Sequence, residues 1–152
     1  MDETRALYII TEGKTDAAIL HTLLVCDKFQ KVYQVPAGGF GNLSSVAKTI
    51  RLMNSPNESK DKILIAFDAD SEDEEVIRNR VGMMRSLTGA DYDKRIGVFY
   101  FVPDIEGSLF HGFDYKKNDM RPLVEFLKEH ADEMRRTNIV IREMLEFIDS
   151  VN

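Results

Sequence analysis

The sequence has little cysteine and no long apolar run, and both absences narrow the class of protein. Its single cysteine, Cys26, cannot form a disulfide within the chain or a multi-thiolate zinc site. A reducing cytoplasm is therefore the compartment we expect. No apolar run approaches the roughly 18 residues needed to span a bilayer, so we expect no association with the membrane interior. Residues 1–10 lack the basic start and small cleavage-type residues of a secretory signal.

The sequence also lacks an excess of basic residues. Of its 152 residues, 20 are Lys or Arg and 26 are Asp or Glu, which gives a net charge of −6. This balance argues against a protein that coats nucleic acid nonspecifically, because phosphate binding needs clustered Lys and Arg. Five carboxylates considered below supply most of the acidic excess, however, so net charge alone does not decide the partner. With 43% hydrophobic residues, the chain is long and apolar enough to form one folded domain.

Short apolar runs alternate with segments of helical periodicity, which is the pattern of βαβ units. We expect strands at residues 7–10, 32–35, 63–67 and 96–102, and helices at residues 15–26, 43–54, 71–88, 122–134 and 141–148. The third helix is predicted to begin at Ser71, because Ser71 and Glu74 have the spacing of a capping box. The predicted fold is α/β, a Rossmann-like three-layer arrangement with roughly four parallel strands flanked by helices. We assign residues 1–112 to this domain and residues 113–152 to a helical extension packed on the same domain.

Acidic residues follow three of the predicted strands at their carboxyl ends. They are Glu12 and Asp16 after the first strand, Asp68 and Asp70 after the third, and Glu106 after the fourth. Open parallel sheets bind ligands at this edge, where the strand order reverses. If the first, third and fourth strands are neighbours, the carboxylates converge there. Their mutual repulsion then raises their pKa values unless a cation occupies the space between them.

The residue types in this group favour a hard divalent cation. Carboxylate oxygens without His or Cys suit Mg²⁺, with Mn²⁺ as a substitute, rather than zinc. Asp68 and Asp70 are two residues apart, so in an extended segment both side chains face the same ion. Glu12 lies on a strand-to-helix turn, and Asp16 lies in the first helical turn, where the helix dipole favours an anion.

These residues also have simpler interpretations. An Asp-x-Asp sequence after a strand is common in loops, Asp16 suits any first helical turn, and Glu106 suits the start of a short helix. The Gly38-Gly39 turn is a weak phosphate loop, since it lacks the Gly-x-Gly-x-x-Gly and Walker spacings. The pair Lys116-Lys117 is typical of a solvated turn. What favours a site is that acidic residues recur at the ends of three strands.

The order of these motifs resembles the TOPRIM domain of topoisomerases, DnaG-type primases and overcoming-lysogenization-defect (OLD) nucleases. Thr11–Asp16 is similar to the first TOPRIM motif, Glu-Gly-x-x-Asp, and Phe67–Asp70 is similar to the second, Asp-x-Asp. The segments Pro36–Asn42 and Ile105–Phe110 are similar to the OLD branch of the family. The resemblance covers roughly residues 6–112, or about two-thirds of the chain.

The resemblance implies Mg²⁺-dependent phosphodiester chemistry on nucleic acid, by a nuclease or a nucleotidyl-transfer enzyme. It implies metal binding by Glu12, Asp16, Asp68, Asp70 and Glu106, with catalytic roles for Glu12, Asp68 and Asp70. It further implies contacts with phosphate or nucleic acid from Gly13, Lys14, Gly38, Gly39, Lys116 and Lys117. We see in the sequence no ATPase domain, primase zinc module or topoisomerase tyrosine domain. Because the acidic surface does not favour unaided binding to long duplex DNA, a homodimer or a protein partner is expected to supply basic surface.

Two other functions remain open at this point. A receiver-like regulatory domain would accept a phosphoryl group on Asp68, but such a domain needs a lysine after a later strand, where this chain has Pro103–Glu106. A non-catalytic protein that binds a metal, a nucleotide or a protein partner would retain the acidic residues without turnover.

Overall fold

A computed structural model describes residues 6–24, 29, 31–53, 61–109 and 120–150 of the chain. Within these ranges the strands are β1 (Ala6–Thr11), β2 (Lys31–Pro36), β3 (Lys62–Asp68) and β4 (Ile96–Phe101). The helices are α1 (Lys14–Leu24), α2 (Leu43–Met53), α3 (Glu74–Thr88), α4 (Ile105–Leu109), α5 (Met120–Thr137) and α6 (Ile139–Asp149), and a short 3₁₀ turn, η1 (Phe40–Asn42), precedes α2.

The sheet has the order β2–β1–β3–β4, and all neighbouring strands run parallel. This confirms the predicted α/β class. It also makes the first, third and fourth strands neighbours, which is the condition under which the carboxylates at their ends converge. The chain adds β2 on one side of β1, and then β3 and β4 on the other side. The carboxyl ends of β1 and β3 therefore form the switch point, the edge at which open α/β sheets bind ligands.

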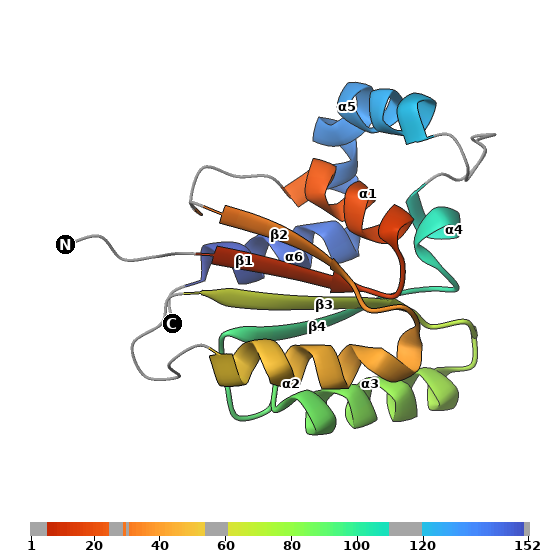
Figure 1. The fold of residues 1–152 in the computed structure, drawn as a ribbon. Helices are drawn as coiled ribbons and strands as arrows, with labels where there is room; N and C mark the ends of the chain where they lie inside the picture. Colours follow the sequence, from red (N-terminus) through yellow and green to blue (C-terminus); the bar gives the residue numbers. More distant parts are fainter. Residues whose placement is uncertain (1–5, 25–28, 30, 54–60, 110–119, 151–152) are drawn as a thin grey trace.

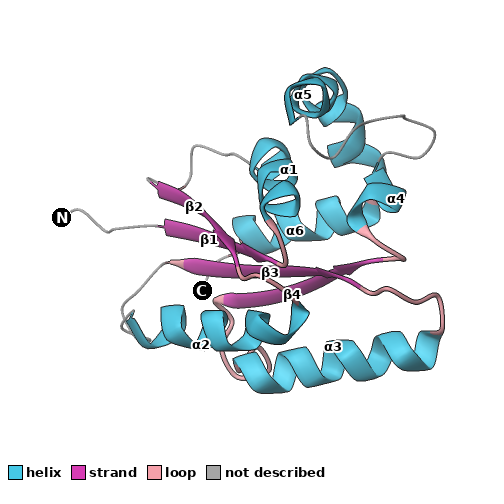
Figure 2. Cartoon of the chain, turned by 45° about the vertical axis from the view of Figure 1, so that its right-hand side comes forward, coloured by secondary structure: helices cyan, strands magenta, loops and turns pink. Residues whose placement is uncertain are grey.

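Helices cover both faces of the sheet and make three layers (Figures 1 and 2). Helices α2 and α3 lie on one face, and α1, α5 and α6 lie on the other. In β3, Ile63 and Ile65 belong to the core under α2 and α3, whereas Leu64 and Ala66 belong to the opposite core. A strand with both faces covered needs apolar residues at successive positions, which explains the unbroken apolar run at 63–67.

The C-terminal helices, drawn in blue in Figure 1, complete one of the two outer layers. Helix α5 packs on α1, and α6 packs on β4 and α1. Their buried residues share one core with Leu7 and Leu64: Leu123, Leu127, Ala131, Met134, Ile141, Met144 and Ile148. The part of residues 113–152 that is described is thus integral to the three-layer fold. Among the described helices, none is long and apolar enough to cross a membrane.

The N-cap of α3 lies two residues later in the chain than the sequence predicts. Asp73 is the N-cap, and its side chain accepts hydrogen bonds from the amides of Glu75 and Val76. The Ser71 hydroxyl instead accepts a hydrogen bond from the Asp73 amide. The predicted capping box is therefore wrong, because aspartate is at least as good an N-cap as serine and lies nearer to the first helical turn. The helix ends as predicted, with Gly89 in the left-handed region at φ 84°.

Candidate metal centre

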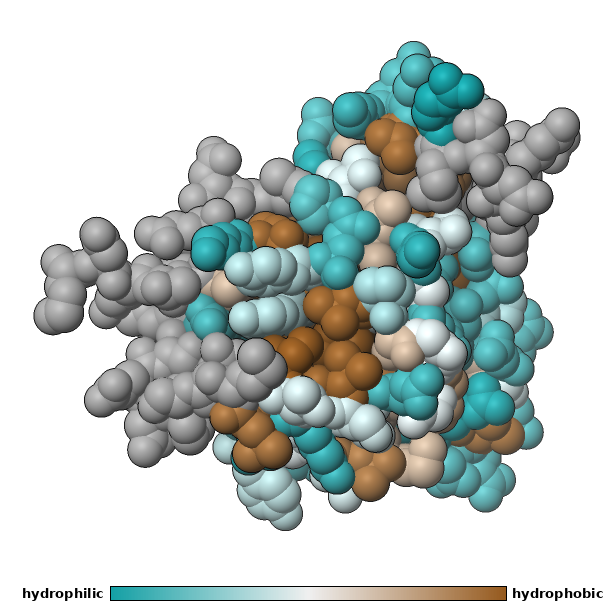
Figure 3. All heavy atoms as spheres, in the orientation of Figure 1, coloured by the Kyte–Doolittle hydropathy of each residue, from teal (hydrophilic) through white to brown (hydrophobic). Residues whose placement is uncertain are grey.

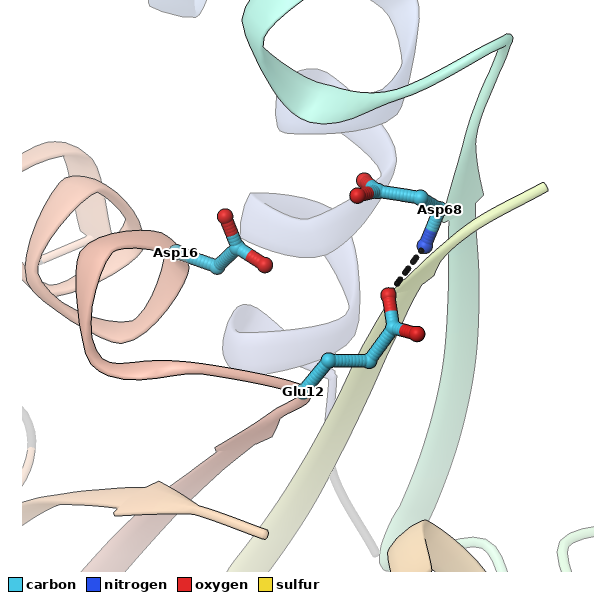
Figure 4. Close-up of side chains that lie close together, drawn as sticks. All are labelled: Glu12, Asp16 and Asp68. Carbon is cyan, nitrogen blue, oxygen red and sulfur yellow. Dashed lines mark hydrogen bonds between the residues drawn. The ribbon is translucent and has the colours of Figure 1, made fainter. Parts of the chain in front are cut away.

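Three carboxylates meet at the switch point of the sheet. Glu12 directly follows β1, Asp68 is the last residue of β3, and Asp16 lies in the first turn of α1. Each offers one oxygen, and these oxygens all lie within 4.8 Å of one another. Figure 4 shows the side chains of Asp16 and Asp68 turned toward the same space, with Glu12 beside them. The group has no His or Cys, so its donors are the hard oxygens that Mg²⁺ and Mn²⁺ prefer.

Backbone hydrogen bonds hold Glu12 from two sides. Its carbonyl oxygen accepts from the amides of Gly38, at 2.9 Å, and Gly39, at 3.1 Å, which ties the end of β1 to the turn after β2. Its Oε2 accepts from the Asp68 amide at 3.1 Å, which ties the side chain to the end of β3 (dashed line in Figure 4). Gly38 and Gly39 have φ values of 88° and 137°, conformations in which a side chain is strained. The glycine pair therefore positions Glu12.

Asp68 is held by the segment that follows β4. Its Oδ1 accepts a hydrogen bond of 2.8 Å from the amide of Ile105, the first residue of α4. The next two residues continue along β4, because the Ala69 amide donates to the Phe101 carbonyl and the Asp70 amide to the Pro103 carbonyl. Three elements, β1, β3 and the start of α4, thus fix the geometry of this carboxylate.

Burial and neighbouring carboxylates both raise the pKa values of Asp68 and Glu12. The pKa of Asp68 is raised to about 7, mainly by burial and in addition by repulsion from Asp16, Glu106 and Glu12. The hydrogen bond from the Ile105 amide acts in the opposite direction and lowers the pKa. Burial also raises the pKa of Glu12, as do the charges of Asp70 and Glu106. A cation bound among these oxygens would relieve the repulsion, so the electrostatics fit a divalent ion.

All the predicted site residues that the structure describes line one open cavity of about 450 Å³. Its lining residues are Glu12, Gly13, Lys14, Thr15, Asp16, Gly38, Gly39, Asp68, Asp70 and Glu106. Lys116 and Lys117 lie outside the described residues. Among the lining residues, Thr15 is not one of the predicted site residues, and Lys14 has an exposed side chain.

Asp70 does not lie as the sequence predicts. The expected extended segment ends at Asp68, and Asp70 has a left-handed backbone with φ 53°. Its side chain is exposed and does not belong to the group of oxygens within 4.8 Å, although its charge raises the pKa of Glu12. The physical reason is that the amides of Ala69 and Asp70 donate hydrogen bonds to carbonyls at and just after the end of β4. These bonds turn the chain before it enters α3. Glu106 lines the cavity from α4 and also stands outside the close group.

The amides of Gly38 and Gly39 both donate to the Glu12 carbonyl oxygen. A phosphate in the cavity therefore does not meet a free amide at either glycine in this arrangement. Their contact with phosphate stays a prediction, and Lys14, with its exposed side chain in the cavity lining, is the better placed of the predicted phosphate contacts.

Sequence reasoning missed Arg80 of α3. Its Nη1 donates to the carbonyl of Ala69, between the two aspartates of the Asp-x-Asp motif, and its guanidinium lies 6.0 Å from the centre of the Phe40 ring. Its charge also lowers the pKa of Glu12. A signal was present: Arg80 is three residues after Ile77 and four before Met84, so it interrupts the stripe of α3 that faces the sheet.

Searches against protein-family models and against curated proteins find no match for this chain. The case for the site therefore depends on the geometry and electrostatics of the cavity itself.

Proposed function

We propose that this protein carries out Mg²⁺-dependent phosphodiester chemistry on nucleic acid, as a nuclease or a nucleotidyl-transfer enzyme. The observation that carries the proposal is the group formed by Glu12, Asp16 and Asp68, whose oxygens lie within 4.8 Å at the switch point of a parallel sheet. The resemblance of Thr11–Asp16 and Phe67–Asp70 to the two TOPRIM motifs supports it. The single cysteine fits the reducing cytoplasm that the proposal assumes.

Glu12, Asp16 and Asp68 would hold the metal ion, and Asp70 and Glu106 would bind water or a second ion at the edge of the cavity. When bound, Mg²⁺ polarises a phosphate oxygen and stabilises the leaving oxygen. If Glu12 does not hold the ion, it is the candidate general base, and burial raises the pKa of its carboxylate toward the range in which it accepts a proton at neutral pH. Lys14 offers a positive charge to the phosphate from the rim of the same cavity.

Calorimetric titration with Mn²⁺ tests the proposal. Asp68→Asn keeps the shape of the side chain and the Oδ1 that accepts from Ile105, but it removes the charge. We expect wild-type protein to bind Mn²⁺ and Asp68→Asn to lose that binding while it keeps its thermal unfolding transition. Glu75→Gln, an exposed residue in the first turn of α3, is the charge-matched control and is expected to bind as wild type does.

Metal-dependent cleavage of labelled DNA and RNA oligonucleotides, abolished by Asp68→Asn, would then establish the reaction. Equal Mn²⁺ affinity in Asp68→Asn and wild type would contradict the proposed site. Absence of Mn²⁺ binding in the wild type at millimolar concentration would leave the non-catalytic partner protein as the better interpretation.

A receiver-like function is the second candidate, and the strand order supports it. The order β2–β1–β3–β4 matches the first four strands of the flavodoxin-like arrangement, in which receiver domains are also built. Asp68 lies at the end of β3, where it could accept a phosphoryl group. The residues after β4, from Val102 to Leu109, contain no lysine to pair with that group. An increase in mass after incubation with a small phosphodonor, absent in Asp68→Asn, would favour this function over the first.

A further inference from the structure

The last residue of β1 is a buried polar side chain beside the metal centre. Thr11 is 0% exposed, and the other buried residues of β1 are apolar: Ala6, Leu7, Ile9 and Ile10. Figure 3 shows mostly hydrophilic side chains on the right-hand side of the molecule, toward which the strands run in Figure 1. Thr11 thus lies beneath a polar edge but out of contact with water. A valine suits the end of a buried strand equally well, so strand packing alone does not account for the hydroxyl.

The hydroxyl of Thr11 joins the end of β1 to the start of α1. Its Oγ1 donates a hydrogen bond of 2.7 Å to the carbonyl of Gly13. The same carbonyl accepts a hydrogen bond of 3.2 Å from the amide of Ala17 in α1. One carbonyl oxygen is therefore shared by a side chain of the strand and an amide of the helix. Glu12 lies in the turn that the Thr11 hydrogen bond closes.

This hydrogen bond restrains a turn that contains a glycine. A Cβ at Gly13 would meet no atom within 4 Å, so close packing does not confine this residue. Glycine also has the widest choice of backbone conformations, and Gly13 separates Glu12 from the helix that carries Asp16. The hydrogen bond from Thr11 removes part of that freedom and so fixes the direction in which α1 leaves β1.

The backbone carbonyls of the same segment are directed to β2 instead. The Thr11 carbonyl accepts a hydrogen bond of 2.8 Å from the Ala37 amide, and the Glu12 carbonyl accepts from the glycine pair that follows β2. These bonds fix Glu12 relative to β2 but do not reach α1. Packing places the body of α1 on β1 and β2, and the Thr11 hydroxyl holds its first turn, where Asp16 lies.

We propose that Thr11 is a positioning residue of the metal centre, whose hydroxyl holds Glu12 and Asp16 at the separation at which both reach the ion. The inference rests on the proposed function, in which these two residues and Asp68 bind the metal. Their oxygens lie within 4.8 Å of one another, and carboxylates that close repel one another. Without the hydroxyl, the Gly13 carbonyl keeps only its bond within α1, and the repulsion can move the first turn of α1 away from Glu12.

Calorimetric titration of the full chain with Mn²⁺ tests the inference. Thr11→Val replaces the hydroxyl with a methyl group of similar size, and we expect it to weaken Mn²⁺ binding by about 10-fold or more, as loss of a group that orients a ligand does. Thr11→Ser keeps the hydroxyl and is expected to restore wild-type binding. Thr11→Ala differs from Thr11→Ser only in the hydroxyl, so this pair decides the question even if valine prevents folding. We expect Thr11→Ala to bind as weakly as Thr11→Val.

Thr88 provides a matched control. It is also 0% exposed, and its Oγ1 donates a hydrogen bond of 2.7 Å to the Met84 carbonyl. Helix α3 runs from the end of β3 back to the start of β4, so Thr88, its last residue, lies at the opposite edge of the sheet from the metal centre. Thr88→Val is expected to lower the thermal unfolding midpoint but to bind Mn²⁺ as wild type does. Equal losses of Mn²⁺ affinity in Thr88→Val and Thr11→Val would overturn the inference, because both would then follow from lower stability.

A second measurement reports on Glu12 without a metal. The Asp68 amide donates to Glu12 Oε2 at 3.1 Å, so its NMR resonance in EDTA depends on where that carboxylate lies. We expect the resonance to move in Thr11→Val and to stay in place in Thr11→Ser and Thr88→Val.

The two measurements together separate this inference from the proposed function. Mn²⁺ binding that both Thr11→Val and Thr11→Ala retain in full overturns the inference alone, whatever the Asp68 resonance does. A wild type that binds no Mn²⁺ contradicts the proposed function, whereas a resonance that moves only in Thr11→Val still supports the role of Thr11 in placing Glu12. A resonance that does not move in such a protein overturns both.

Discussion

Asp68 is the residue at which stability and the proposed function conflict. Burial and the charges of Asp16, Glu106 and Glu12 raise its pKa from 3.8 to about 7. At pH values between 3.8 and about 7, Asp68 is mostly protonated in the folded chain and mostly ionised in the unfolded chain. The contribution to stability is therefore fully present below about pH 4 and is lost as the pH rises through about 7.

We predict that the free energy of unfolding of the metal-free protein falls between pH 5 and pH 8 on account of Asp68. Asp68→Asn carries no such charge, so it is expected to be more stable than wild type at pH 8 and to differ less from it at pH 5. Urea denaturation in EDTA at the two pH values measures the effect, with Glu75→Gln as the control. If Asp68→Asn is less stable than wild type at pH 8, then burial and the neighbouring carboxylates do not destabilise the ionised Asp68 side chain as inferred.

Replacement of Arg80 distinguishes two roles of its side chain, because the two roles predict opposite changes in the affinity for a metal ion. Coulomb repulsion alone predicts that removal of this cation tightens the binding of a metal ion nearby. The hydrogen bond from Arg80 to the Ala69 carbonyl instead holds the backbone between Asp68 and Asp70. We expect this positioning role to dominate, so Arg80→Gln is expected to weaken Mn²⁺ binding by about 10-fold.

The control for Arg80 lies on the same helix. Arg78 is exposed and lines a different cavity, beside Tyr100 and Val102, so Arg78→Gln makes the same charge change away from the site. Mn²⁺ titration of both variants and wild type gives the comparison. Tighter binding in Arg80→Gln would show that Arg80 acts only through its charge.

The two aspartates of the Asp-x-Asp motif show what sequence can predict at this scale. Asp68 could be placed because it ends a strand, and strand ends in a parallel sheet share one edge. Asp70 could not be placed, because its φ of 53° accompanies hydrogen bonds from the amides of Ala69 and Asp70 to the carbonyls of Phe101 and Pro103. These partners are more than 30 positions away in the chain, so no local pattern encodes the turn.

At the scale of elements, two helices end against cationic side chains that are distant in sequence. Lys62, the first residue of β3, is 1% exposed, and its Nζ donates to the carbonyls of Phe147, Ile148 and Ser150 at the end of α6. Arg135 of α5 donates from Nε to the Leu23 carbonyl at the end of α1, at 2.8 Å. Each side chain satisfies carbonyls that have no partner within the helix and favours the negative end of its dipole.

Lys62→Met is predicted to lower the free energy of unfolding by about 2 kcal/mol, because hydrogen bonds from a charged donor to the last turn of α6 are lost. Methionine fills a similar volume, so the loss reports on the hydrogen bonds rather than on a cavity. Urea denaturation measures it, and Lys94→Met, at an exposed lysine before β4, is the control. An unchanged midpoint in Lys62→Met would show that water replaces the ammonium at the helix end.

Element order was predictable from the sequence, but these long-range caps were not. The period of the apolar residues indicates which segments are strands and which are helices. A lysine at the start of an apolar strand gives no sign of its acceptor, since the partner carbonyls belong to residues 147–150 and depend on how α6 crosses the sheet.

At the scale of the whole molecule, the three layers fix the place of the C-terminal helices. The resemblance to TOPRIM covers roughly residues 6–112, which alone would suggest a complete domain. The structure shows instead that α1 and α6 cover one face of the sheet with α5 packed on them, and that Leu7 and Leu64 share their core with residues of α5 and α6. The sequence predicted the packing of these helices on the domain but gave no measure of how much core they provide.

We predict that a chain ending at residue 112 does not fold cooperatively. It loses the burial of seven apolar side chains, namely Leu123, Leu127, Ala131, Met134, Ile141, Met144 and Ile148. At about 1.5–3 kcal/mol for each large side chain, the loss is on the order of 10 kcal/mol, which is comparable with the whole stability of a typical domain. It also removes the acceptors of Lys62 and leaves that ammonium at the edge of an uncovered core.

Circular dichroism during heating and two-dimensional NMR of the truncated chain measure this. We expect no cooperative transition and poorly dispersed signals, and we expect addition of a peptide of residues 113–152 to restore both. A truncated chain that unfolds cooperatively and still binds Mn²⁺ through Asp68 would mean that the sheet, α1 and the helices of the opposite face suffice for the site. The helices α5 and α6 would then serve a purpose other than folding. The expected result makes the metal centre dependent on them, because Asp16 is held in place by α1, and α1 packs against both.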